Sequence, residues 1–284
     1  MVKKYGLRTD FCDEMLVNKH SDDTLHYTKK VCDSYIVTSI SILKEENILQ
    51  KDIGEYITID FENIYDLKNR KAISACVCNC LKQISPKGFH KVLVIGLGNN
   101  NAVSDALGPQ TCDKVMVTSH YFMLHKQMQL QGCSNVGVFV PKVMGQTGME
   151  SAHLCKLVTA YFKPDLVLVI DALATSSRKR INSAIQMNNV GINPGSGVNN
   201  KREAINEQSL GCPVISLGVA TVSSLHALMK EVFEEATFPY DKIKNVADLD
   251  LIVTPKNMDE DVIYLSGILA DGINRFLHPD FDQL

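Results

Sequence analysis

The sequence predicts an α/β fold built around a mostly parallel sheet, and three observations predict it. Several short apolar runs lack polar alternation, as strands do when both faces of their sheet are covered. Segments with helical spacing separate these runs, which is the pattern of a parallel α/β sheet. The 284 residues, 45% of them hydrophobic, supply enough apolar side chains for one large core. No internal repeat or long linker divides the chain, so we expect one main domain.

The expected strands are short segments rich in Val, Ile and Leu. Five of them have the look of buried parallel strands: Lys91–Gly96, Val136–Val140, Asp165–Ile170, Pro213–Gly218 and Asp250–Thr254. The earlier stretch Tyr56–Ile59 alternates in polarity and predicts a strand in a small accessory N-terminal β region.

The expected helices lie between these strands. Thr147 followed by Glu150 has the spacing of a capping box, so we expect a helix to begin there. Its apolar positions recur every three or four residues: Leu154, Leu157, Val158 and Tyr161. Lys71–Leu81 and Lys256–Phe276 are also expected to be helical. Leu7–Asp23 carries many acids and no clear period, so it is expected to be a mobile arm.

Composition argues against several classes of protein. The net charge of −3 gives no basic excess for direct binding to nucleic acid. No apolar run reaches the roughly 18 residues that a membrane span needs, and no signal peptide precedes the fold, so we expect a cytoplasmic protein and no membrane partner. The nine cysteines include only one close group, Cys76, Cys78 and Cys80. Its C-x-C-x-C spacing does not match a zinc site, so we expect reduced thiols and no metal.

The tripeptide Asp-Ala-Leu occurs twice, each time shortly after an apolar run. Asp105 lies in SDALGPQ and Asp171 lies in VIDALAT, directly after LVLVI. Aspartates at the carboxyl ends of parallel strands lie where α/β folds bind ligands. Crowding two carboxylates raises the pKa of one, so that one can donate a proton while the other accepts one from water. This pair is suited to the general acid–base hydrolysis of an amide.

Each aspartate also has a purely structural interpretation. Asp105 would serve as the N-cap of the next helix, and Asp171 would bind nearby backbone or one of Arg178 and Arg180. Gly96 and Gly98 resemble the start of a dinucleotide-binding loop, but Asn101 stands where the third glycine belongs. Neither a G-x-S-x-G elbow nor a His-based metal motif such as H-E-x-x-H is present; His120, His125 and His153 do not have that spacing.

A third candidate stretch is the loop GINPGSGVNNKRE, residues Gly191–Glu203. Its glycines leave backbone N–H groups free to hold an anion, an oxyanion or an extended peptide. The residues expected to bind substrate are Gly195, Ser196, Gly197, Lys201 and Arg202. A loop-forming role without any ligand is the alternative, since such turns are common.

These stretches together resemble the bacterial spore germination protease family. The motifs are GLGNNNAVSDALGP, VMGQTGMES, KPDLVLVIDALATSSRKRINSAIQ, GINPGSGVNNKR and LIVTPK, in the order of the family and across nearly the whole chain. The resemblance implies a three-layer α/β/α sandwich related to hydrogenase-maturation peptidases. It also implies an endopeptidase with two essential aspartates, which fall on Asp105 and Asp171. We expect no cofactor.

The resemblance further implies substrates, processing and assembly. The expected substrates are small acid-soluble spore proteins in the forespore or spore core, and the expected assembly is a homotetramer. The family is made as a zymogen that cuts itself after a Thr-acidic pair and before an apolar residue. Thr9, Asp10 and Phe11 match, which places the cut between Asp10 and Phe11. Residues 1–10 would form the pro-segment and residues 11–284 the peptidase domain.

Two alternatives stay open at the level of sequence. One is an α/β protein that binds a nucleotide or another small ligand and uses its aspartates structurally. The other is an inactive relative that binds spore proteins without cutting them. A metal held by the two carboxylates and a third donor is a minor variant of the protease hypothesis.

Overall fold

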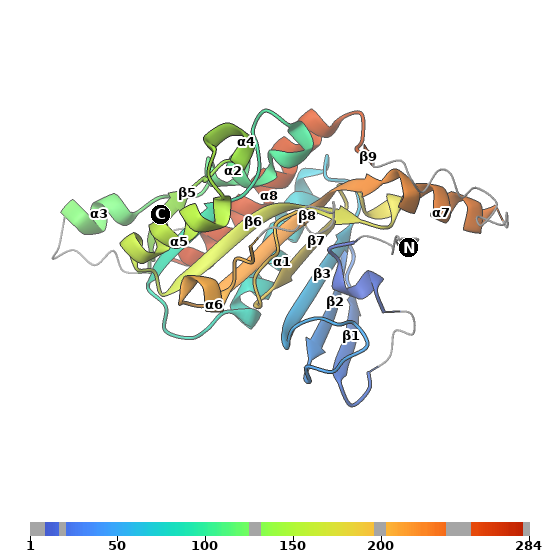
Figure 1. Ribbon diagram of the computed structural model, residues 1–284, viewed down its shortest axis with the longest axis horizontal. Helices are drawn as coiled ribbons and strands as arrows, with labels where there is room; N and C mark the ends of the chain where they lie inside the picture. Colours follow the sequence, from blue (N-terminus) through green and yellow to red (C-terminus); the bar gives the residue numbers. More distant parts are fainter. Residues whose placement is uncertain (1–8, 17–20, 125–131, 196–202, 237–250, 281–284) are drawn as a thin grey trace.

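The fold is one large sheet with helices on both faces (Figure 1). The computed structural model describes residues 9–16, 21–124, 132–195, 203–236 and 251–280. Within these ranges the sheet has nine strands in the order β1-β2-β3-β7-β8-β6-β4-β5, with β9 paired to β8. The α/β fold class is confirmed.

The parallel part of the sheet carries the expected strands. It consists of β5 (Asn135–Phe139), β4 (Lys91–Gly96), β6 (Leu166–Thr175) and β8 (Val214–Ser224), which pair in that order. All four coincide with or contain most of an apolar run that the sequence predicts to be a strand. Two of them are longer than expected, because β6 and β8 continue to pair with each other beyond Ile170 and Gly218.

The N-terminal β region is not a separate accessory sheet, and the sheet as a whole is mixed rather than mostly parallel. Strand β3 (Gly54–Phe61) pairs antiparallel with β7 (Ala184–Asn188), and β7 pairs antiparallel with β8. Strands β1 (Leu25–Val31) and β2 (Tyr35–Ile42) then extend the same sheet outward. The pairing of β7 with β3 and β8 depends on contacts between segments far apart in sequence, so local periodicity cannot predict it.

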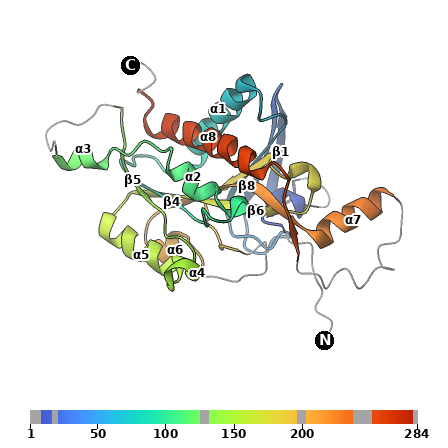
Figure 2. The same cartoon turned by 90° about the horizontal axis from the view of Figure 1, so that it is seen from above.

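Helices cover the two faces of the sheet (Figure 2). On one face lie α1 (Leu67–Ile84), α2 (Leu107–Cys112) and α8 (Met258–Leu277). On the other face lie α4 (Met144–Thr147), α5 (Ser151–Phe162) and α6 (Glu207–Leu210). The remaining elements are α3 (Ser119–Leu124), α7 (Leu225–Glu235), β9 (Ile252–Val253) and three 3₁₀ turns, η1 (Cys12–Glu14), η2 (Val103–Asp105) and η3 (Arg178–Arg180).

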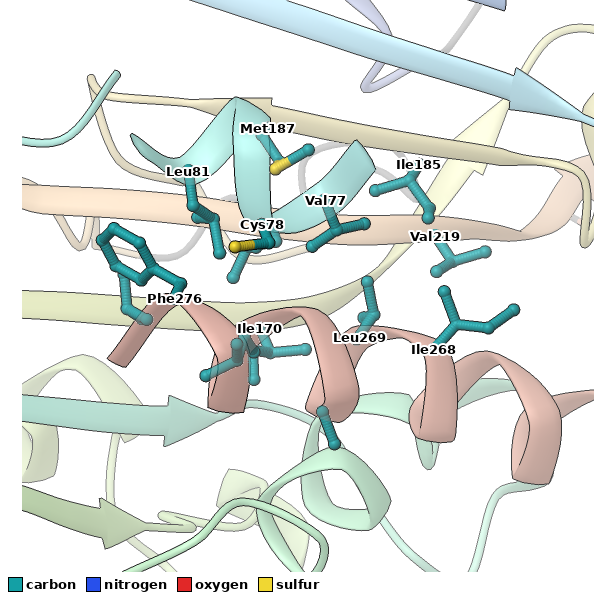
Figure 3. Packing of buried hydrophobic residues seen from close by; sticks show 14 of the residues in the cluster. Val77, Cys78, Leu81, Ile170, Ile185, Met187, Val219, Ile268, Leu269 and Phe276 are labelled. Atoms are coloured by element: carbon teal, nitrogen blue, oxygen red, sulfur yellow. The ribbon is translucent and has the colours of Figure 1, made fainter. Parts of the chain in front are cut away.

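The main core lies between the sheet and the α1–α8 layer. Val77, Cys78 and Leu81 of α1 meet Leu269 and Phe276 of α8 over strands β6, β7 and β8 (Figure 3). A second cluster lies on the opposite face, where Ala152 and Cys155 of α5 pack on β4 and β6. Burial of this apolar surface is the main stabilising term of such a fold, at about 25 cal/mol per Å².

The three cysteines of α1 all belong to the main core. The Sγ atoms of Cys76 and Cys80, which are four residues apart on the helix, lie 3.9 Å from each other. All nine cysteines are free thiols.

The expected N-cap of the α5 segment is wrong. Thr147 is the last residue of the short helix α4, which ends in the left-handed Gly148. Helix α5 begins after Glu150. Two of its expected core positions, Leu157 and Tyr161, are 68% and 84% exposed, so the buried face is narrower than the spacing suggested.

The last predicted strand is also different from expectation. Among the described residues 251–254 of this stretch, Ile252–Val253 forms a strand, and it pairs antiparallel with the end of β8. Ile252 is half-exposed, so this strand is an edge addition and not a buried parallel strand.

Candidate active site

Asp105 and Asp171 lie on the wall of one pocket at the carboxyl ends of β4, β6 and β8. The pocket has a volume of about 290 Å³. Its lining comes from segments that are far apart in the sequence: Leu97, Gly98, Ala102, Ser104, Asp105, Val143, Ser151, Asp171, Ala172, Pro194, Gly195, Thr221, Val222 and Ile252. The two Asp-Ala-Leu stretches therefore meet at one site.

Asp105 is held by a tight loop between β4 and α2. The N–H of Asn99 donates to the Asp105 carbonyl (2.9 Å), and the N–H of Asp105 donates to the Ala102 carbonyl (2.7 Å). Asp105 ends the turn η2, and α2 begins after Ala106, whose side chain has no capping group. The interpretation of Asp105 as the N-cap of this helix is wrong.

Glycine at position 108 lets α2 approach the ends of β4 and β6 closely. A Cβ atom there would lie 2.2 Å from the Leu97 carbonyl oxygen and 2.7 Å from that of Ile170. Only a residue without a side chain permits this contact of backbone with backbone. The close approach of α2 fixes where the preceding turn η2 presents Asp105.

Asp171 is part of β6 and not a residue beyond its end. Its side chain is 8% exposed, and its Oδ1 accepts a hydrogen bond from the N–H of Ala172 (2.9 Å). Gly218 pairs with Asp171 across the neighbouring strand, which leaves that cross-strand position without a side chain. Arg178 and Arg180, considered above as partners for Asp171, form ion pairs with other carboxylates.

Substitution of Gly98 by alanine tests the loop that holds Asp105. Gly98 has φ +114°, and a Cβ there would lie 2.0 Å from the Asp105 carbonyl oxygen. Gly88 is a matched control, since its φ is +80° but nothing lies within 4 Å of its Cβ position. We expect Gly88→Ala to cost about 1–2 kcal/mol of unfolding free energy for the left-handed backbone alone. Gly98→Ala should cost about 1–3 kcal/mol more, because the Asp105 backbone must move.

Denaturant unfolding gives the loss of unfolding free energy in each variant, and the rate of peptide cleavage is measured on the same samples. Equal losses of stability at the two glycines, with cleavage unchanged in Gly98→Ala, would show that this loop does not position Asp105.

The glycine-rich loop reaches the same pocket at its beginning. Pro194 and Gly195 line the pocket. Ser196, Gly197, Lys201 and Arg202, which were also expected to bind substrate, lie outside the described residues. Two polar lining residues had not been named as candidates: Ser151, the first residue of α5, and Thr221 of β8. Ser151 is the last residue of the motif VMGQTGMES, whereas Thr221 lies in none of the motifs that carry the resemblance.

The segment around the predicted processing site is bound to the sheet. The N–H of Asp10 donates to the Ala174 carbonyl (2.9 Å), and the Asp10 carboxylate accepts from the Ala174 N–H (2.8 Å). Phe11 is fully buried against Leu173, Ala184 and Ala220. For residues 9–16 the expectation of a mobile arm is therefore wrong.

Polar groups hold the peptide bond between Asp10 and Phe11 in place. Nε2 of Gln186 donates to the Asp10 carbonyl (2.8 Å), and Oε1 of the same side chain accepts from the Cys12 N–H (2.6 Å). Asp10 and Gln186 line a second, polar pocket of about 90 Å³ next to the loop at 191–193. Asp10 does not line the pocket of Asp105 and Asp171.

Charged groups anchor the residues after Phe11. Arg180 contacts Asp13 (2.5 Å), Glu14 (3.3 Å) and Asp60 (2.8 Å) in a nearly buried cluster. Burial raises the pKa of Asp60 above its ordinary value, and the charge of Arg180 opposes this rise. Burial also raises the pKa of the Cys12 thiol to about 12.

Neither a metal site nor a membrane span is found in the part of the chain that the structure describes. No three His, Cys, Asp or Glu side chains within it lie close enough together to hold a metal ion. No helix within it is both long and apolar enough to cross a membrane.

The fold and the pocket first define a class: an α/β protein with an acidic pocket at the carboxyl ends of parallel strands, where such folds bind their ligands. The particular family follows from comparison with known proteins. The model of the family described as germination protease matches residues 11–234. The chain belongs to the germination protease family. It is a protease with a role in spore germination.

Relatives cover nearly the whole chain. A germination protease of Clostridium perfringens (strain SM101 / Type A) is 35% identical, and the match covers 97% of this chain and 96% of the relative. One of Caldanaerobacter subterraneus subsp. tengcongensis is 34% identical over 100% and 98% of the two chains. Among solved structures, the [NiFe] hydrogenase maturation protease HycI from Thermococcus kodakarensis KOD1 matches with a TM-score of 0.32 and 14% identity, over 66% of this chain and 94% of that one.

Proposed function

We propose that the chain is a self-processing endopeptidase that cuts small acid-soluble spore proteins at a paired-aspartate site formed by Asp105 and Asp171. The observation that carries this proposal is the shared pocket, which both side chains line although they are 66 positions apart in sequence. Two carboxyl groups that lie close together can share one proton, which gives one acid and one base, and the proposal assigns this arrangement to the pocket.

The chemistry follows from one protonated and one ionised carboxyl group. The ionised group accepts a proton from water as the water oxygen bonds to the peptide carbonyl carbon. The protonated group then gives its proton to the amide nitrogen as the C–N bond breaks. Pro194 and Gly195 lie at the same pocket, and the loop they begin would hold the extended substrate backbone, together with Ser196, Gly197, Lys201 and Arg202.

The proposed specificity for an acidic residue followed by an apolar one is supported by how the chain holds its own segment Thr9–Phe11. The Ala174 N–H binds the Asp10 carboxylate, and an apolar pocket encloses Phe11. Arg180 lies over the Phe11 ring, with its Cζ 5.5 Å from the ring centroid.

Self-processing requires the segment Thr9–Phe11 to leave its place on the sheet and to enter the pocket of Asp105 and Asp171, in its own chain or in another copy of it. Asp10 is bound to Ala174, three residues beyond Asp171 on β6, and the Gln186 side chain holds its carbonyl group. Asp10 does not line the pocket of Asp105 and Asp171, so the peptide bond after it is not presented to these two carboxylates. We therefore expect processing to be slow while the sheet holds residues 9–16.

Intact mass of the purified protein tests this proposal. The wild type is incubated at mildly acidic pH beside Asp105→Asn and Asp171→Asn. We expect the wild type alone to lose the mass of residues 1–10. An acid-soluble spore protein is then added to each, and we expect cleavage between an acidic and an apolar residue by the wild type only. Cleavage of that protein by either variant at the wild-type rate would refute the paired-aspartate site.

The proposal also includes a homotetrameric assembly and a location in the cytoplasm of the forespore. Sedimentation of the purified protein tests the assembly, and a fluorescent fusion in sporulating cells tests the location. A monomer at all concentrations, or fluorescence confined to the mother cell, would contradict these parts.

A further inference from the structure

Thr221 lies at an irregularity in the strand pair that carries Asp171. Strands β6 and β8 pair in register up to Leu173 and Ala220, and the next pair is Ala174 with Val222. Thr221 is therefore the extra residue of a β-bulge. Bulges are frequent next to active sites, because the extra residue re-aims a side chain that a regular strand would place elsewhere.

The hydroxyl group of Thr221 is buried without a partner. Thr221 is 0% exposed, and its Oγ1 has no hydrogen-bond partner among the residues that the structure describes. Its carbonyl oxygen, by contrast, accepts from Oγ1 of Thr254 (3.0 Å). Nearly all buried side-chain hydroxyls in proteins are hydrogen-bonded, so the Thr221 hydroxyl has hydrogen-bonding capacity that no described residue uses.

The same residue lines the pocket of Asp105 and Asp171. Thr221 and the two aspartates therefore belong to the lining of one pocket. Among the hydroxyl-bearing residues of the lining, Ser151 differs from Thr221, because the Ser151 Oγ already donates to the Lys142 carbonyl (2.8 Å).

We propose that Thr221 is a third catalytic residue of the site, whose hydroxyl hydrogen-bonds the water molecule that the aspartate pair activates. This inference rests on the proposed function. The water oxygen bonds to the peptide carbonyl carbon while one of its protons passes to the ionised carboxylate. Thr221 keeps its own proton throughout and holds the water oxygen in line for attack. Such positioning matters because a misplacement of about 1 Å costs on the order of 10²-fold in rate.

Thr221→Val is the test, since valine has the shape of threonine without the hydroxyl. We expect kcat on a peptide substrate to fall about 10²-fold, with KM close to that of the wild type. The melting temperature should not fall, because a methyl group replaces an unpartnered hydroxyl. Thr221→Ser keeps the hydroxyl and should retain most of kcat. If the hydroxyl had a purely structural role, its removal in Thr221→Val would instead lower the melting temperature and leave kcat unchanged.

Thr159→Val is the matched control. The Thr159 Oγ1 is likewise buried without a partner among the described residues, but it lies in α5 away from the pocket lining. The same chemical change there should alter neither kcat nor the melting temperature by much.

Crystal structures of the wild type and Thr221→Val separate this inference from the proposed function. In the wild type we expect an ordered water within hydrogen-bond distance of Thr221 Oγ1 and of one aspartate carboxylate, and its loss in the variant. If the water is present but the wild type cuts no peptide, the proposed function fails and the assignment of Thr221 as a water ligand stands. Wild-type cleavage rates in Thr221→Val, or a wild-type pocket without this water, would overturn the inference.

Discussion

Replacing either Asp105 or Asp171 by asparagine is expected to lower the rate of peptide cleavage by about 10²–10⁴-fold while the fold is retained. Asparagine has nearly the shape of aspartate, but it neither accepts nor donates the proton that general acid–base catalysis requires. Both side chains line the pocket, so their loss should affect the reaction and not the core. The measurements are kcat on a spore-protein peptide and the melting temperature of each variant.

The double variant and an unrelated carboxylate provide the controls. Groups that act as a unit are not additive, so Asp105→Asn combined with Asp171→Asn should be about as slow as either single variant. Asp113 is an exposed carboxylate at the end of α2, and Asp113→Asn should leave cleavage unchanged. Multiplicative losses in the double variant would contradict a shared proton between the two aspartates.

Replacing Arg180 by methionine is expected to destabilise the fold by about 3–5 kcal/mol, because it leaves buried carboxylates without their cation. The Arg180 side chain is 16% exposed and contacts Asp13, Glu14 and Asp60. Asp13 and Glu14 lie two and three residues after Phe11, so this cluster fixes the segment that follows the predicted cut. Chemical denaturation measures the loss of unfolding free energy.

Arg178→Met is the matched control on the same turn. Its side chain is 42% exposed and pairs with Glu235 (2.5 Å) at the surface. Exposed ion pairs contribute about 0–1 kcal/mol, so this change should be small. Similar losses of unfolding free energy in Arg178→Met and Arg180→Met would show that the ion pairs of Arg180 with Asp13, Glu14 and Asp60 do not stabilise the fold more than a surface ion pair does.

The effect of Arg180→Met should depend on pH in a defined direction. The pKa of Asp60 is raised in the folded chain, so the folded state binds more protons than the unfolded state just above pH 3.8. The free energy of unfolding from this group therefore falls as pH rises through the raised pKa. Without Arg180 the pKa of Asp60 rises further, so the variant should be most destabilised at neutral pH and recover part of the loss on acidification. A loss that is constant with pH would contradict this account.

Local pattern was enough to predict most of the parallel part of the sheet. The run Lys91–Gly96 is β4 to the residue, because an uninterrupted apolar strand buried on both faces has a signature in composition alone. The placement of Asp105 and Asp171 at one edge of the sheet was also predictable. Both follow apolar runs, and the carboxyl ends of neighbouring parallel strands meet at the same edge. Their roles in catalysis stay predictions until the variants are measured.

Strand length was less predictable than strand position. The apolar run before Asp171 ends at Ile170, but β6 continues to Thr175 because its backbone still pairs with β8. That pairing depends on hydrogen bonds to residues 47 or 48 positions further along the chain, and the composition of β6 carries no information about them.

By itself, the sequence determined the α/β class, the parallel strands and the family, because each depends on residues that lie close together along the chain. Only the tertiary structure decided that β3 joins the main sheet through β7, that Phe11 is buried on this sheet, and that a bulge brings Thr221 to the aspartate pocket. Each of these features depends on contacts between segments distant in sequence. Their free energy comes from pairing and burial across the whole sheet, which no single segment encodes.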